Sequence, residues 1–178
     1  MKNRFIQIII LFLIVLFVGC NSREEKRPGF SLSDTKKTLE KINKGLVDKD
    51  RESIEAYIDR HRLDGVEENK SGLFYLIWEE PTGPKPVAGN IVILDYKVTL
   101  LDGTFCYSSE NGKPKEFLVG HGGVESGLEM GILLMHQGQR AKLILPPHLA
   151  HGLLGDNDKI PPRSIIVYDI HLLTVIDN

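Results

Sequence analysis

The histidine and cysteine side chains of this 178-residue sequence could bind a metal ion, and a cysteine could also attack a substrate. His148 and His151 stand three positions apart, and His121 is a third candidate ligand. Zinc sites combine such histidines with cysteines or carboxylates at short, regular spacings, and this sequence has neither a cysteine ligand pair nor a histidine-rich tail. We therefore interpret the histidine spacing as coincidence and predict no metal site.

Cys106 could act as a reactive thiol or fill the core as a small apolar residue. A reactive thiol needs surroundings that lower its pKa, and the sequence around Cys106 shows no sign of them. We therefore favour the buried interpretation.

Main-chain N–H groups offer another kind of chemistry between Gly120 and Ile132. Gly122 and Gly123 can adopt backbone angles closed to other residues, so the chain can turn sharply there and expose its N–H groups. Ser126 followed by Glu129 has the pattern of a capping box, which predicts a short helix beginning at Ser126. Its predicted apolar face consists of Leu128, Ile132 and Met135, and Gly138 is the predicted end of the helix.

Strands are predicted on both sides of this helix, at residues 73–78, 90–101, 104–107, 116–119, 140–145 and 165–175. Several consecutive strands with one short helix between them predict an α+β fold, in which an antiparallel sheet wraps around that helix. The two-residue period places an apolar set on the inner side, although pattern alone does not separate a concavity from a filled core. This set comprises Tyr96, Phe105, Phe117, Val124, Leu128, Ile160 and Tyr168.

The first 19 residues have the pattern of a secretory signal peptide, because Lys2 and Arg4 precede an apolar run over residues 5–18. The run ends at Phe17-Val18-Gly19-Cys20, which resembles a bacterial lipobox and implies lipid attachment at Cys20. An uncleaved signal anchor is the alternative. Lipidation of Cys20 would leave Cys106 without a disulfide partner, and residues 20–32 have the composition of a flexible tether. We expect a lipid-anchored protein of the cell envelope that faces the periplasm or the cell surface.

Residues 33–65 form a predicted helical segment. Ser33 or Asp34 is the expected cap of a first helix that Gly45 ends or bends, and a second helix is expected over residues 50–62. Helices this short need a partner, so we expect them to dock on the rest of the chain or to form a homodimer through residues 33–62. The net charge of -2 and the lack of a basic run argue against nucleic-acid binding.

Seven short motifs between residues 72 and 175 occur in the order seen in the FKBP family of peptidyl-prolyl cis-trans isomerases, which the chain resembles. They are Gly103–Ser109, Phe117–Gly120, Val124–Glu129, Gly138–Lys142, Pro147–Gly152, Lys159–Pro162 and Val167–Ile170. The resemblance implies a domain over residues 70–178 with a bent antiparallel sheet clasping one short helix. The lipobox and the helical segment also resemble Bacteroidetes lipoprotein members, including those associated with gliding motility.

The resemblance implies an isomerase that acts on proline-containing polypeptides and needs no cofactor. The residues it implies for the proline pocket are Tyr96, Phe105, Val124, Leu128, Ile160 and Tyr168, with Phe117 as a supporting aromatic. The backbone N–H of Glu125 corresponds to the family's donor to the substrate carbonyl.

Five positions depart from the family pattern. Glu125 stands at an aliphatic position, Cys106 replaces an aspartate, and His151 replaces a tyrosine that bonds ligand, a role its imidazole N–H could take over. Lys115 and Asp156 stand where the family often has an aromatic residue and a histidine.

We expect an isomerase that assists the folding of exported proteins. The alternatives are a weakly active or non-catalytic peptide-binding module for surface or gliding machinery, and a chaperone that dimerises through its helical segment. Pro161-Pro162 is either a docking motif or, more simply, part of a loop that closes over the pocket.

Overall fold

The computed structural model describes residues 32–109 and 113–177. The predicted signal peptide (1–19), Cys20 and residues 20–31 of the predicted tether lie outside the described residues. Within the described ranges, no helix has both the length and the apolar run needed to cross a membrane. The chain divides into two compact units between Ile42 and Asn43.

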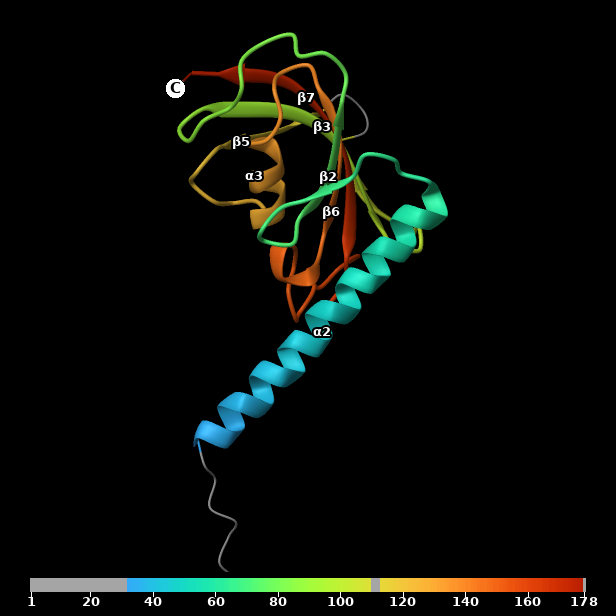
Figure 1. Ribbon diagram of the computed structural model, residues 1–178. Helices are drawn as coiled ribbons and strands as arrows, with labels where there is room; N and C mark the ends of the chain where they lie inside the picture. Colours follow the sequence, from blue (N-terminus) through green and yellow to red (C-terminus); the bar gives the residue numbers. More distant parts are fainter. Residues whose placement is uncertain (1–31, 110–112, 178) are drawn as a thin grey trace, which may run out of the picture. The chain divides into compact units, whose positions relative to one another are not determined.

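The second unit is built on a seven-stranded sheet whose neighbouring strands are all antiparallel (Figure 1). The strand order is β1-β2-β6-β7-β3-β4, and β5 also pairs with β3. The strands are β1 (Glu67–Glu68), β2 (Phe74–Trp78), β3 (Ile91–Leu100), β4 (Phe105–Ser108), β5 (Lys115–Leu118), β6 (Arg140–Leu145) and β7 (Ile166–Ile176). The predicted antiparallel α+β fold is therefore confirmed, although the two-residue strand β1 was not predicted.

Strand β7 lies at the centre of the sheet, between β3 and β6. Its predicted inward residues, among them Tyr168 and Leu172, are buried. Val167, which points to the opposite face, is also only 1% exposed. Both faces of the central strands are therefore covered, and side chains must alternate between two separate cores.

Helix α3 (Ser126–Ile132) covers one face of the sheet. It begins at Ser126 as predicted, but the predicted capping box does not form. The Ser126 hydroxyl lies 3.5 Å from the carbonyl of Leu149, and the Glu129 carboxylate accepts a hydrogen bond from the N–H of Gly120. These partners lie outside the helix, so tertiary contacts replace the local cap. Gly138 was predicted to stop the helix, but the helix already ends at Ile132.

Helix α2 (Leu32–His61) is one continuous helix of 30 residues, so the prediction of two helices separated at Gly45 is wrong. One exposed glycine costs a helix only about 1 kcal/mol, which its flanking turns can offset. Pairs at i and i+4 support both flanks: Lys36 with Glu40, and Arg51 with Glu55.

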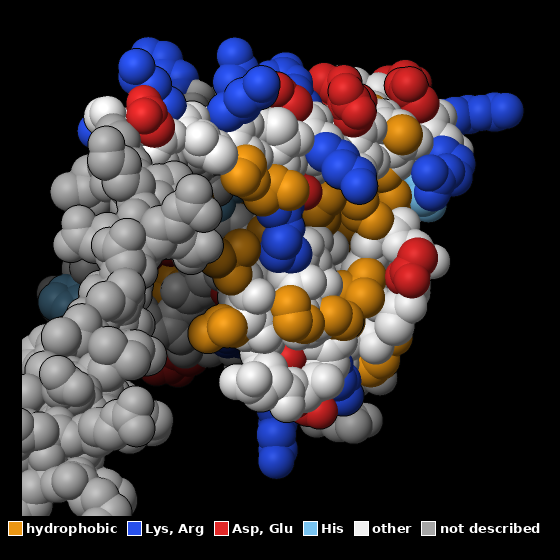
Figure 2. Space-filling view, turned by 90° about the horizontal axis from the view of Figure 1, so that it is seen from below, with side chains coloured by type: hydrophobic (Ala, Val, Ile, Leu, Met, Phe, Trp, Pro, Cys, Tyr) orange, Lys and Arg blue, Asp and Glu red, His pale blue; other side chains and the backbone are white. Residues whose placement is uncertain are grey.

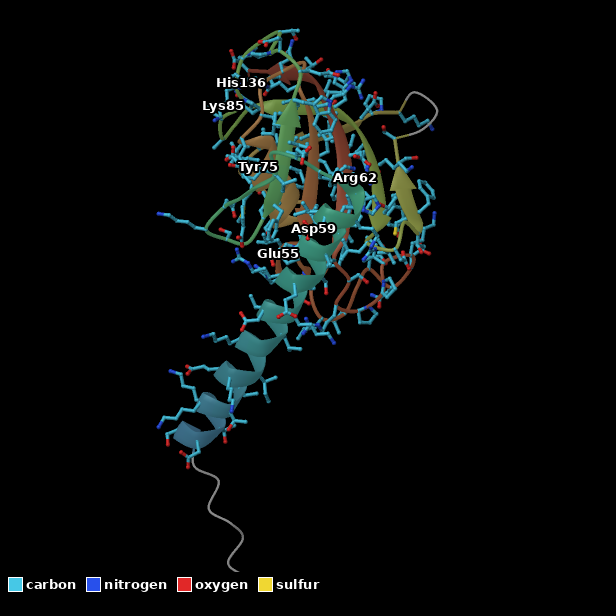
Figure 3. The ribbon with its side chains drawn as sticks, turned by 45° about the vertical axis from the view of Figure 1, so that its right-hand side comes forward. Glu55, Asp59, Arg62, Tyr75, Lys85 and His136 are labelled. Atoms are coloured by element: carbon cyan, nitrogen blue, oxygen red, sulfur yellow. The ribbon has the colours of Figure 1, made fainter. Side chains whose placement is uncertain are left out.

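The part of α2 that belongs to the second unit packs on the sheet face opposite α3. Ile54 and Tyr57 are buried there in a second apolar cluster with Phe74, Ile144 and Val167. Figure 3 shows Glu55 and Asp59 on this part of the helix and Tyr75 on β2. The prediction that the helical segment docks on the rest of the chain is confirmed for the stretch of α2 that carries Ile54 and Tyr57.

Candidate functional site

A hollow of about 500 Å³ lies at the N-terminal end of α3. Three segments that are distant in sequence form its wall: the start of β5, the loop before α3, and the residues after the 3-10 turn Pro147–Leu149. The lining residues are Lys115, Gly123, Val124, Glu125, Ala150 and His151. Three of them, Val124, Glu125 and His151, are residues that the sequence predicted for the site.

The loop before α3 owes its shape to glycine. Gly122 and Gly123 have φ angles of 72° and 86°, in the left-handed region that other residues rarely adopt, which confirms the predicted bends. The bends bring Glu125 to the N-cap position of α3, where its backbone is extended with φ -61° and ψ 139°. The backbone N–H of Glu125 has no acceptor among the described residues, so it is free to bind a ligand.

A buried apolar cluster packs against this loop through Val124. Leu128 from α3, Ile160 from the loop before β7 and Tyr168 from β7 have at most 3% of their surface exposed. The rings of Tyr96 and Tyr168 lie 6.0 Å apart between centroids. The structure thus joins seven predicted site residues in one cluster: Tyr96, Cys106, Phe117, Val124, Leu128, Ile160 and Tyr168.

Phe105 is the predicted pocket residue that the structure leaves outside this cluster. It begins β4 and is 48% exposed. The ammonium of Lys159 lies 5.7 Å from the centroid of the Phe105 ring and 5.0 Å from that of Tyr107. Phe105 is therefore a surface aromatic under a lysine, and its predicted role stays a prediction.

Glu125, His151 and Tyr168 form a hydrogen-bonded group, of which Glu125 and His151 line the hollow. Oε1 of Glu125 accepts a hydrogen bond of 3.0 Å from the Tyr168 hydroxyl and lies 2.9 Å from Nε2 of His151. Burial, together with the nearby carboxylate, strongly raises the pKa of Tyr168, so this hydroxyl remains protonated as the donor. Oε2 of Glu125 is buried and has no hydrogen-bond partner among the described residues.

Cys106 is fully buried. Burial raises the pKa of its thiol, so the thiolate that a nucleophile would need is disfavoured at neutral pH. This agrees with the buried interpretation. A ligand would have to open the core to touch its sulfur.

Asp156 fixes the loop that carries Ile160, a role that was not predicted. Its Oδ1 accepts hydrogen bonds from the N–H groups of Asp158 (2.9 Å) and Ile160 (2.8 Å), and its Oδ2 accepts one from the Tyr107 hydroxyl. Partial burial opposes the charged form, but these hydrogen bonds outweigh it and lower the pKa of Asp156 to about 2. The Asp-x-Asp spacing of 156–158 was the available sequence signal.

Two of the three histidines considered as metal ligands, His148 and His151, have other neighbours. Nε2 of His148 lies 2.9 Å from the carbonyl of Ser71, and His151 contacts Glu125. Over residues 32–109 and 113–177, no group of three or more His, Cys, Asp or Glu side chains is placed to hold a metal ion.

Large hydrophobic side chains are also exposed near the site. Leu153 and Leu154, two and three residues after His151, are 72% and 77% exposed. Figure 2 shows hydrophobic side chains on the surface in patches among charged ones. Such residues are available for contact with an extended apolar ligand.

Comparison with known proteins identifies relatives of this architecture. The sequence profile of the FKBP-type peptidyl-prolyl cis-trans isomerases matches residues 83–173. The chain is 42% identical over 91 residues to the peptidyl-prolyl cis-trans isomerase Fkbp12 of Drosophila melanogaster, covering 51% of this chain and 84% of that protein. It is 34% identical over 139 residues to FkpA of Aeromonas hydrophila, an FKBP-type peptidyl-prolyl cis-trans isomerase, covering 78% of this chain and 51% of that protein.

The fold comparison agrees. The crystal structure of FkpA from Escherichia coli matches with a TM-score of 0.64 and 30% sequence identity, over 84% of this chain and 75% of that one. The chain spans about half the length of the FkpA relatives that it matches in sequence.

Proposed function

The chain belongs to the FKBP-type peptidyl-prolyl cis-trans isomerase family, and from this premise we propose that it catalyses cis-trans isomerisation of X-Pro bonds in polypeptides. The observation that carries the proposal is the free N–H of Glu125 in a hollow that Val124 and Ala150 also line. This arrangement offers a donor to a peptide carbonyl and apolar side chains to a proline ring.

The reaction needs no nucleophile or metal. An X-Pro bond isomerises slowly because rotation breaks amide resonance, and a catalyst need only bind the twisted amide better than the planar one. The twisted amide has lost charge separation, so an apolar surface favours it, while an N–H donor orients the carbonyl before proline. Val124 would supply apolar surface and Glu125 the donor, while Leu128 and Tyr168 belong to the buried cluster that Val124 packs against.

The test is a prolyl isomerisation assay on the chain lacking residues 1–19. We expect faster cis-to-trans conversion of X-Pro peptides than in buffer, and faster refolding of a protein whose slow phase is proline isomerisation. Peptide binding without any acceleration would overturn the proposal. That result would favour the second candidate, a peptide-binding module for cell-surface or gliding machinery. The observation in favour of this candidate is the buried carboxylate of Glu125 at the site.

We also propose that the protein is exported, anchored by a lipid on Cys20, and assists the folding of exported clients. The support is the sequence: Lys2 and Arg4, the apolar run over residues 5–18, and the lipobox-like ending. Labelling of cells with a radioactive fatty acid should mark the wild-type protein and not Cys20→Ala. Equal labelling of both would refute lipidation at Cys20.

A homodimer through residues 33–62 is our proposal for the helical segment. Leu39 and Ile42 of α2 are 56% and 52% exposed, and Val47 is 51% exposed, which is unusual for a lone soluble helix. Light scattering should give twice the chain mass, and Leu39→Glu with Ile42→Glu should halve it. A monomeric mass for the wild type at high concentration would exclude the dimer.

A further inference from the structure

His151 uses one of its two ring nitrogens in a contact with the start of α3. Its Nε2 lies 2.9 Å from Oε1 of Glu125. Since a carboxylate oxygen only accepts hydrogen bonds, Nε2 must carry a proton and donate it. In the neutral ring the proton is therefore on Nε2, and Nδ1 has a free lone pair.

The second nitrogen, Nδ1, is accessible to a ligand. His151 lines the hollow, and 26% of its side chain is exposed. Among the described residues Nδ1 has no hydrogen-bond partner, and the only buried side-chain nitrogen or oxygen atom without a partner is Oε2 of Glu125. Nδ1 is thus not a buried atom, and a bound molecule can reach it.

The protonation state of His151 decides what Nδ1 can bind. In the neutral ring Nδ1 accepts a hydrogen bond, whereas in the imidazolium both nitrogens donate. The peptide around an X-Pro bond presents mainly acceptors, because proline has no N–H and the carbonyls on both sides of it remain. The imidazolium is therefore the form that can bind a peptide carbonyl through Nδ1 while Nε2 still binds Glu125.

The groups that face His151 come from four elements. At the N-cap of α3, the Glu125 carboxylate contacts Nε2. In the loop before β7, burial opposes the charge of Asp156, but hydrogen bonds and the attraction of His151 lower the pKa of this carboxyl. On β5, Lys115 lines the same hollow and opposes a second positive charge, while on β7 the Tyr168 hydroxyl donates to Glu125. An imidazolium at this position therefore has two carboxylates against one ammonium among its neighbours.

We propose that His151 is a ligand-binding residue whose imidazolium form donates through Nδ1 to a carbonyl of the bound peptide, so that the peptide binds more tightly at mildly acidic pH. This inference rests on the proposed function, in which the Glu125 N–H binds the carbonyl before proline. His151 binds a second carbonyl, which is not part of the rotating bond. The planar and the twisted amide gain equally from this hydrogen bond, so it changes KM and not kcat.

The test measures KM and kcat of the full-length chain in mild detergent at about pH 5.5 and pH 8, because imidazoles change charge between these values. The substrate is acetyl-Ala-Leu-Pro-Phe-amide, which has no group that titrates in this range, and NMR follows the exchange between its isomers. We expect KM to be about tenfold lower at the acidic pH, the effect of one charge-assisted hydrogen bond, with kcat unchanged.

Two variants show whether His151 is the titrating group. In His151→Gln, whose amide does not ionise, KM should be the same at both pH values. His148→Gln is the matched control, since His148 lies in the neighbouring 3-10 turn and its Nε2 is 2.9 Å from the carbonyl of Ser71. This control should keep the wild-type pH dependence. Equal KM values in the wild type overturn the proposal, as does a pH dependence that persists in His151→Gln or disappears in His148→Gln.

Thermal unfolding at both pH values shows whether His151→Gln is folded, and His151→Asn replaces it if it is not. If neither variant folds, the ¹⁵N chemical shift of Nδ1 in the wild type decides: a change on adding the peptide at the acidic pH supports the proposal, and no change refutes it. If the peptide is isomerised no faster than in buffer, the proposed function fails. Dissociation constants of the same peptide then decide the present inference: tighter binding at the acidic pH that His151→Gln abolishes supports it, and equal affinities refute it.

Discussion

The Tyr168 hydroxyl donates a hydrogen bond of 3.0 Å to Oε1 of Glu125, which joins the central strand β7 to the N-cap of α3. Tyr168 is 2% exposed, and it lies 43 positions after Glu125, with α3 and β6 between them. One bond thus links the buried apolar cluster to the residue that carries the free N–H of the hollow. Its strength can be measured.

Tyr168→Phe should lower the free energy of unfolding by about 1–2 kcal/mol, because the carboxylate loses a buried donor while the ring stays in place. Urea denaturation measures the change. In a Glu125→Ile background the same substitution should cost little, because the hydroxyl then has no carboxylate to bind. Additive effects in this double-mutant cycle would contradict the coupling.

A second prediction concerns the packing of α3 on β6. A Cβ added at Gly131 would overlap the Cδ1 atom of Leu143, which is fully buried. Gly131→Ala should therefore destabilise the domain by about 1–3 kcal/mol, although alanine is the better helix former. Denaturation of Gly131→Ala with Leu143→Val should recover part of the loss. No loss in the single variant would show that α3 can shift on the sheet.

Gly45 also lies in a helix and is the control for Gly131, because we expect the same substitution to stabilise the protein there. A Cβ at Gly45 meets no atom within 4 Å, so Gly45→Ala should stabilise α2 by about 1 kcal/mol through helix propensity alone. Circular dichroism at 222 nm on heating measures the helix content. A loss of helicity in Gly45→Ala would mean that the glycine has a role in contact with another molecule.

The strand pattern could be predicted because it is local. Alternation in β7 marked its inner face correctly, and the fold follows from several such strands around one helix. Gly45 was misjudged because a glycine is only a weak helix breaker, and its effect depends on the turns around it. The second buried face, with Val167 and Phe74, could not be predicted without knowing that α2 covers it.

The candidate site also has features that the sequence predicted and features that it did not. The glycine bends before Glu125 were predicted, since positive φ angles depend on the residues themselves. The capping box at Ser126 does not form because Glu125 is the N-cap of α3, and the Glu129 carboxylate accepts a hydrogen bond from the N–H of Gly120 instead, a contact that sequence spacing does not show. The partners of the Glu125 carboxylate are 26 and 43 residues away, so only the fold reveals them.

The docking of α2 provides a further prediction. Nη2 of Arg163 lies 2.9 and 2.8 Å from the two carboxylate oxygens of Asp50, and both side chains are largely buried. Asp50→Ala should lower the free energy of unfolding by about 1–3 kcal/mol, because the guanidinium is left without its partner. Asp50→Ala with Arg163→Ala should cost less than the sum of the two single variants. Additive costs would show that the pair does not hold the helix.

The stability of the loop that carries Ile160 should depend on pH through Asp156. Its folded pKa of about 2 lies below the value of about 3.9 expected in the unfolded chain, so its contribution is complete above about pH 4 and is lost as the pH falls to about 2. The same contact raises the pKa of Tyr107 to about 12, so a second contribution is lost as the pH rises from about 10 to about 12.

Denaturation of wild type and Tyr107→Phe across these ranges separates the two groups. Tyr107→Phe should reduce the alkaline loss by the share of Tyr107 and weaken the acid loss, because two backbone N–H groups still bind Asp156. Asp156→Asn should reduce the acid loss by the share of Asp156, because an amide does not ionise. Asp158→Asn is the matched control, since Asp158 contacts the same hydroxyl at 3.2 Å but does not accept the N–H of Ile160, and it should keep the acid loss. An unchanged acid loss in Asp156→Asn would place the titrating group elsewhere and remove Asp156 from the support of Ile160.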